Sequence, residues 1–314
     1  MAGFYCSISV PDKAVLTANA PDKPGLNSIE VIKDARKTKA YKLMEKGQYT
    51  QAVQEVNKLL NSNPHDVSNV FCAAMVYMKA GSKNDAFVQM KKALALAPRN
   101  KDLRLEFARM LTETGQTEDA ITQYRMVIKQ APKFTGPRMD LAQLLLSIGQ
   151  PGEAAKELQD LIKVNPNDVS AHKVLGIALA RDGHAQEGME EYLTGMTTET
   201  SAGQPEAVKF ILGSWGNIDK AKFELEQQAN RNPDDPMPKL RLAEICLYGG
   251  RPEEAKSLLL DARKLSPNNP EIHRSLCIAF KRLGDNRQAL TSFMQSVALE
   301  QEQNKKLKMK VLVK

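Results

Sequence analysis

The sequence predicts an all-α fold, built as an array of about eight antiparallel helix hairpins. Three observations carry this prediction: a glycine recurs every 34 residues, small residues flank it at fixed distances, and a proline follows it at a fixed distance. Aromatic residues make up only 5% of the 314 residues, fewer than an all-β sandwich usually contains. A repeat of this length is typical of solenoids, in which each unit buries its apolar face against its neighbours.

The recurring glycine is expected to end the first helix of each hairpin. Because glycine adopts a positive φ without a steric penalty, it is favoured where a helix ends in a left-handed turn. The interval is 34 residues except for one of 33. The eight positions are Gly47, Gly81, Gly115, Gly149, Gly183, Gly216, Gly250 and Gly284.

Small residues and prolines complete the repeat. A small residue lies seven positions before and five positions after most of the glycines, as Ala108 and Ala120 do around Gly115. Small residues at these places allow the two helices of a hairpin to approach closely. A proline follows six of the eight glycines by 17 residues. It is expected to end the second helix, because proline lacks a backbone N–H and restricts the residue before it.

This register resembles the tetratricopeptide repeat family over residues 28–303. The resemblance implies a right-handed α-solenoid whose first helices line a concave groove, where partner peptides bind. It therefore implies a non-enzymatic protein–protein interaction scaffold or adaptor that binds a protein or peptide segment. Lys37 matches one position of the family's clamp for a C-terminal carboxylate, but Tyr41 replaces an asparagine that the clamp needs, so the clamp is not expected.

Two segments flank the predicted solenoid, and one interrupts it. Residues 1–27 contain three prolines and are expected to form an irregular N-terminal arm. Residues 195–205, between the fifth and sixth units, lack the repeat proline; they indicate either a hinge or docking notch, or simple divergence of one repeat. Residues 304–314 form a basic C-terminal tail, whose cations are Lys305, Lys306, Lys308, Lys310 and Lys314.

The resemblance also locates the expected partner-binding groove, at fixed distances before each repeat glycine. In the first four units these positions are mostly apolar and rich in methionine, which favours binding of varied apolar side chains; alternatively, helix rotation buries some of them between repeats. Later units carry cations there, suited to partner carboxylates or to a solvated face. The predicted groove residues are Tyr41, Met44, Phe71, Met75, Met78, Leu105, Arg109, Met139, Gln143, Leu146, Lys173 and Arg181.

No arrangement of residues indicates catalysis. The four histidines are scattered over different units, and no phosphate-binding, nucleophile or paired zinc-ligand motif is present. We therefore expect no enzymatic activity, no cofactor and no metal. The four cysteines lack the spacing of a disulfide framework, and neither a signal peptide nor a transmembrane run is recognisable. These observations predict a cytoplasmic protein.

The net charge of +7 suggests an acidic partner at first sight. The tail contributes +5 and residues 1–27 sum to zero, which leaves +2 for residues 28–303. Nucleic acid is therefore an unlikely partner. Two alternative functions stay open: a nucleic-acid-binding helical repeat protein, and a membrane-associated assembly factor that makes a weak contact through the lysine-rich tail. A monomer or a weak homodimer is expected.

Overall fold

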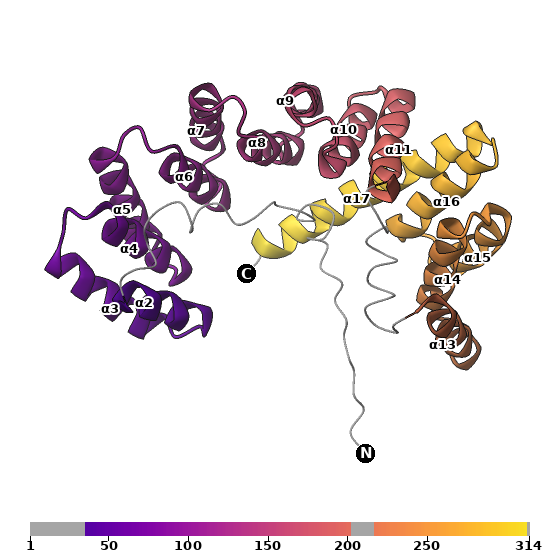
Figure 1. Ribbon diagram of the computed structural model, residues 1–314, viewed down its shortest axis with the longest axis horizontal. Coiled ribbons are helices and arrows are strands. Elements are labelled where there is room, and N and C mark those ends of the chain that lie inside the picture. The colour runs from indigo at the N-terminus through magenta and orange to yellow at the C-terminus, as the bar shows by residue number, and fades with distance from the viewer. Residues whose placement is uncertain (1–34, 202–216, 313–314) are drawn as a thin grey trace, which may run out of the picture. The chain divides into compact units, whose positions relative to one another are not determined.

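The structure is a computed structural model that describes residues 35–201 and 217–312 (Figure 1). These residues form fifteen helices and no strand, so the predicted all-α solenoid of helix hairpins is confirmed. The expected N-terminal arm lies outside the described residues. So do residues 202–205 of the irregular junction.

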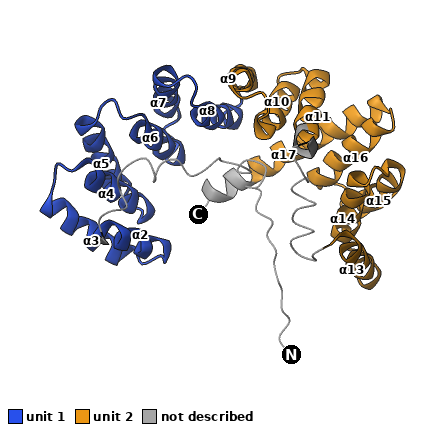
Figure 2. Cartoon of the chain, viewed as in Figure 1, with its two compact units in different colours: residues 1–149 blue, residues 150–314 orange. Residues whose placement is uncertain are grey.

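The chain divides into two compact units at Gly149 (Figure 2). The N-terminal unit contains α2 (Ala35–Glu45), α3 (Tyr49–Ser62), α4 (Val67–Lys79), α5 (Lys83–Leu96), α6 (Lys101–Glu113), α7 (Thr117–Gln130) and α8 (Gly136–Ser147). The C-terminal unit contains α9 (Pro151–Val164), α10 (Val169–Arg181), α11 (Ala185–Ser201), α13 (Ile218–Arg231), α14 (Pro236–Tyr248), α15 (Pro252–Leu265), α16 (Pro270–Arg282) and α17 (Asn286–Leu312).

The repeat glycines lie in the left-handed turns that the sequence predicts. Seven of the eight have φ values between 70° and 96°, and the remaining one, Gly216, lies outside the described residues. At each of these seven glycines the next helix begins two residues later, as at Gly115, where α7 starts at Thr117. The left-handed conformation is strained for residues with a Cβ atom, so each glycine fixes the end of a first helix.

The starts of the first helices also follow from the sequence. Asp or Asn stands two residues after five of the six repeat prolines, and its side-chain oxygen accepts a hydrogen bond from a backbone N–H of the first turn. Asp66 does this for Asn69 at 2.8 Å, for example. The five residues that cap first helices in this way are Asp66, Asn100, Asp168, Asp235 and Asn269.

The two helices of the fifth hairpin approach each other closely at glycines in the small-residue positions of the repeat. Gly176 on α10 faces Gly188 on α11, and a Cβ atom added to Gly176 would lie 2.5 Å from the Gly188 carbonyl oxygen. Gly195 likewise lies against α10, because an added Cβ atom would lie 3.0 Å from the Val169 carbonyl oxygen. Gly195 is therefore part of α11, which continues through the first residues of the predicted junction to Ser201.

The C-terminal unit contains a contact that the repeat pattern does not predict. The rings of Tyr192 on α11 and Phe293 on α17 lie 5.4 Å apart, and both belong to one buried apolar cluster. Lys281 Nζ also lies 2.7 Å from Glu190 Oε1. The fifth and eighth hairpins thus pack directly on each other (Figure 1). We call this the five–eight contact. A simple solenoid expects contacts only between consecutive repeats.

The last helix is longer than the repeat requires. α17 continues to Leu312, so residues 304–312 of the expected basic tail are helical rather than a separate irregular segment. The other second helices within the described residues contain 14 residues, apart from the longer α11, whereas α17 contains 27. The boundary that charge suggests at residue 304 is therefore not a boundary of secondary structure.

Candidate functional site

The predicted groove residues do not all reach solvent. In the N-terminal unit, α4, α6 and α8 form one layer and α5 and α7 the other (Figure 1). Phe71 on α4 and Leu105 on α6 are only 2% and 3% exposed, so they pack inside the unit. The other predicted groove residues of this unit are partly exposed, and we call them the first-helix surface: Tyr41, Met44, Met75, Met78, Arg109, Met139, Gln143 and Leu146.

Methionine gives the first-helix surface much of its apolar character. Met44 lies on α2, Met75 and Met78 on α4, and Met139 on α8. The first, second and fourth repeats therefore each contribute at least one methionine, and the third contributes none. The thioether side chain adapts its shape to different partners at little energetic penalty. Partly exposed methionines on neighbouring first helices are therefore suited to hold apolar side chains of a partner.

A charged cluster replaces the methionine in the third repeat. Arg109 Nε donates to Asp140 Oδ2 and Arg109 Nη1 donates to Glu106 Oε1, both at 2.8 Å, so the guanidinium joins α6 to α8. Burial raises the pKa of both carboxyl groups, while Arg109 acts in the opposite direction. Both carboxylates accept hydrogen bonds from Arg109. Its guanidinium therefore connects the third repeat to the fourth.

The cations of the later units are mostly engaged within the chain. Arg274 forms an ion pair with Glu300, and Arg241 Nη1 donates to Glu244 and Glu271 at 2.8 and 2.9 Å. These contacts join α14, α16 and α17. A partner carboxylate would therefore have to displace an existing partner at Arg241 or Arg274.

The two predicted groove residues of the C-terminal unit lie on α10 and are partly exposed. Arg181 Nε is buried without an acceptor, and burial lowers the pKa of this guanidinium. Lys173 lies on the same helix, two turns earlier, near Gly195 of α11. These residues belong to a different compact unit from the first-helix surface.

Two of the four histidines have a structural role that sequence reasoning missed. His172 and His273 each stand eleven residues before a repeat glycine, and their Nε2 atoms lie 2.9 and 2.7 Å from the carbonyl oxygens of Pro166 and Pro267. Arg104 and Lys239 occupy the same repeat position and donate to the carbonyl oxygens of the corresponding prolines. In the sequence this role is indicated by a basic side chain eleven residues before a repeat glycine. Its hydrogen bond to the proline carbonyl oxygen holds the turn between two repeats.

The described residues contain no group of three or more His, Cys, Asp or Glu side chains arranged to hold a metal ion. In the same part of the chain, no helix combines the length and apolar composition that crossing a membrane requires. Cys72, Cys246 and Cys277 are buried thiols. Burial raises the pKa of Cys246 to about 11 and that of Cys277 to about 12, so both stay protonated at neutral pH.

Comparison with known proteins identifies the repeat. Two family models, both described as tetratricopeptide repeat, match the chain, one at residues 77–134 and 216–277 and the other at residues 139–201. No curated protein matches the chain.

Several solved structures are similar to this chain at low identity. MamA is 20% identical, with a TM-score of 0.46, over 52% of this chain and 95% of that one. PilF of Pseudomonas aeruginosa is 16% identical, with a TM-score of 0.48, over 76% of this chain and 94% of that one. YrrB, described as a TPR protein with an unusual peptide-binding site, is 15% identical, with a TM-score of 0.41, over 69% and 95%.

Proposed function

Because the chain belongs to the tetratricopeptide repeat family, whose models match more than half of its residues, we propose that it is a protein–protein interaction scaffold that binds a partner segment on the first-helix surface. Proteins of this family are in general scaffolds rather than enzymes. The observation that supports this surface is the row of partly exposed apolar side chains on the first helices: Met44, Met75, Met78, Met139 and Leu146.

The chemistry of this surface favours an apolar segment as its partner. Arg109 is already paired with Glu106 and Asp140, so the centre of the surface offers no uncompensated cation to an acidic ligand. The methionines on either side supply flexible apolar contacts. A segment whose apolar side chains repeat along a helix or an extended strand would bury them there, because removal of apolar area from water drives association.

The proposal is tested by placing charge on this surface and on the opposite layer. In the test variant, Met75→Glu and Met78→Glu add two carboxylates to α4. In the control, Val88→Glu and Met126→Glu add two carboxylates to α5 and α7, at side chains that are 61% and 45% exposed. Each full-length protein is cross-linked in its native cells, and captured partners are quantified by mass spectrometry.

We expect the test variant to lose a specific set of partners that the wild type and the control both retain. Circular dichroism melting curves establish that both variants fold. Equal partner sets for the wild type and the folded test variant would overturn the assignment of the surface. Phe71→Glu is unsuitable, because that side chain is buried and the substitution would test packing.

A further inference from the structure

One face of α2 differs from the same face of the later first helices. In α4, Cys72, Ala73, Val76 and Tyr77 pack on Ala40 and other apolar side chains of the first repeat. The corresponding residues, 34 positions earlier, are Thr38, Lys39, Lys42 and Leu43. In α6 and α8 the positions of Lys39, Lys42 and Leu43 are again buried and apolar: Phe107, Met110 and Leu111, and Leu141, Leu144 and Leu145. The face that stacks repeats together is thus lysine-rich in α2.

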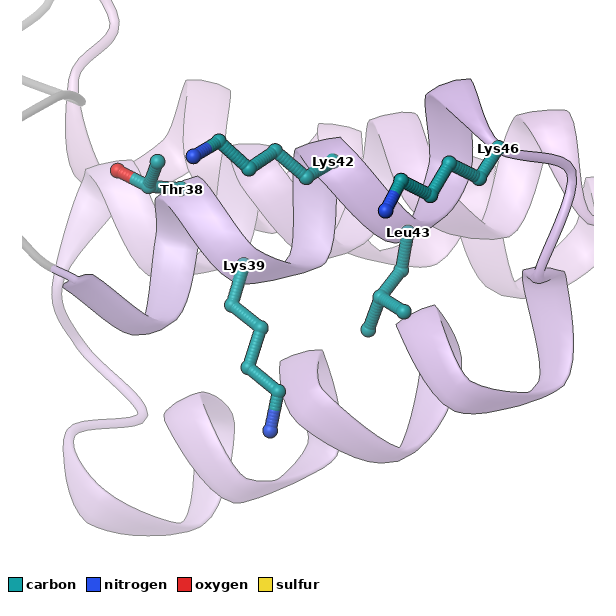
Figure 3. Close-up of a pocket in the computed structure, with 5 residues that line it drawn as sticks. All are labelled: Thr38, Lys39, Lys42, Leu43 and Lys46. Atoms are coloured by element: carbon teal, nitrogen blue, oxygen red, sulfur yellow. The ribbon is translucent and has the colours of Figure 1, made fainter.

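This face forms an open depression of about 490 Å³, lined by Thr38, Lys39, Lys42, Leu43 and Lys46 (Figure 3). We call these five residues the terminal lysine face. At 100° per residue, the four that lie on α2 span an arc of roughly 140°, and Lys46 follows directly after the helix. Tyr41 and Met44, which belong to the first-helix surface, lie outside this arc. The terminal lysine face is therefore a separate surface, and an inference about it does not rest on the proposed function.

Within the part of the chain that the structure describes, the lysines of this face carry more positive charge than neighbouring carboxylates neutralise. Lys39 Nζ lies 3.0 Å from Glu55 Oε1, but Lys58 Nζ binds the same oxygen at 3.1 Å. One carboxylate is thus shared by two ammonium groups. Lys42 and Lys46 are exposed and form no ion pair with any residue that the structure describes.

Charge is segregated between residues 35–149 and residues 150–303, which the near-neutral total for residues 28–303 conceals. Residues 35–149 contain 18 basic and 10 acidic residues, a net charge of +8. Residues 150–303 contain 18 basic and 23 acidic residues, a net charge of −5. The terminal lysine face therefore belongs to a unit whose field attracts anions, and fields of this kind accelerate association with acidic partners.

We propose that the terminal lysine face binds an acidic segment of a partner protein, whose carboxylates accept hydrogen bonds from Lys42 and Lys46. A terminal repeat needs a polar outer face to stay soluble and to prevent further repeats from stacking on it. That role does not require all the charged side chains of the face to be positive. Nucleic acid fits less well, because none of the five lining side chains is aromatic and no platform for stacking bases is present. Exposed ion pairs are individually weak, so the binding depends on several contacts and on low ionic strength.

The test measures binding of a fluorescent Glu-rich peptide to the full-length protein by anisotropy, with a Gln-rich peptide of equal length as the neutral probe. The test variant is Lys42→Glu with Lys46→Glu. The control is Lys83→Glu with Lys91→Glu, which changes the net charge equally at exposed lysines of α5 in the same unit. The basic residues 305–314 are present in all three proteins, so differences between them report on the changed lysines.

We expect the wild type to prefer the Glu-rich peptide, with affinity falling as salt rises from about 50 to about 300 mM. The test variant should bind about tenfold more weakly, and the control less than about threefold more weakly. Absence of binding by the wild type, or equal losses in both variants, would overturn the proposal. So would tighter binding of oligothymidylate than of the Glu-rich peptide at the same salt concentration, because that result assigns the face to nucleic acid.

Discussion

The two compact units use the same hairpin in different ways. The N-terminal unit carries a charge of +8 over residues 35–149 and ends in a lysine-rich face on α2. In the C-terminal unit, residues 150–303 sum to −5 and the basic residues 304–314 bring the total to zero, and its α11 and α17 pack together through Tyr192 and Phe293. Among the described residues, Lys42 and Lys46 of the first unit form no ion pair, whereas Arg241, Arg274 and Lys281 of the second unit pair with carboxylates of neighbouring helices.

This difference shows that hairpins with the same repeat pattern can make different contacts. In a one-dimensional array, stability is a sum over neighbouring repeats. The five–eight contact adds a long-range term, which links residues about 90 positions apart, as Glu190 and Lys281 do. We therefore expect the C-terminal unit to unfold as one cooperative body, and the N-terminal unit to respond more locally to substitutions.

The largest expected effect comes from removing the aromatic side chain at the centre of the five–eight contact. Phe293 is 1% exposed, so Phe293→Ala leaves a cavity and should destabilise the C-terminal unit by about 3–5 kcal/mol. Hydrogen exchange followed by mass spectrometry should show lost protection in α10, α11, α16 and α17 but not in α4 or α6. Loss of protection confined to α16 and α17 would show that the five–eight contact does not couple the hairpins. Val88→Ala, at an exposed site, is the matched control.

The next effect concerns the close helix approach within the fifth hairpin. Gly176→Ala places a methyl group 2.5 Å from the Gly188 carbonyl oxygen, so α10 and α11 must separate. We expect destabilisation of about 1–3 kcal/mol, measured by urea unfolding. Gly136→Ala is the control, because its nearest neighbour would be the Phe134 ring at 3.6 Å. Equal unfolding midpoints for the two variants would mean that the helices of this hairpin tolerate a wider spacing.

The sequence predicts the local features of both units and little of the contact between distant hairpins. Gly115 and its equivalents are visible because each fixes a backbone conformation at its own position. Tyr192 and Phe293 occupy ordinary apolar positions of their helices, so nothing local distinguishes them. The burial of Phe71 and Leu105 depends on a small rotation of α4 and α6, which a periodic pattern does not resolve. The segregation of charge was present in the sequence, but the total charge concealed it.

A smaller effect, on pH dependence, is expected at Glu244. Burial raises the pKa of Glu244 to about 7 from an ordinary value of 4.5, while Arg241 opposes the shift and Glu271 adds to it. The folded state thus binds a proton between these pH values that the unfolded state releases, so the free energy of unfolding falls as pH rises from about 4.5 to about 7. Glu244→Gln removes this titration.

The Gln variant should therefore gain stability relative to the wild type by an amount that grows to about 2 kcal/mol as pH rises from 5 to 8. Urea unfolding at intervals of pH measures this difference, in which the titrations of Glu271 and of other shared groups largely cancel. A difference that is constant with pH would show that Glu244 titrates near its ordinary value. A variant less stable than the wild type by a growing amount would reverse the sign of the proposed burial effect.

The smallest effect tests whether charge also contributes to the five–eight contact. Lys281 and Glu190 are 2.7 Å apart, with side chains 32% and 49% exposed, so a double-mutant cycle to alanine should give a coupling of about 0.2–1 kcal/mol that decreases with salt. Lys79 and Glu113 in the N-terminal unit, 3.9 Å apart and more exposed, provide the matched cycle and should give a smaller coupling. If the Lys281–Glu190 coupling is indistinguishable from zero, the five–eight contact depends on apolar packing alone, and the units differ in burial rather than in ion pairing.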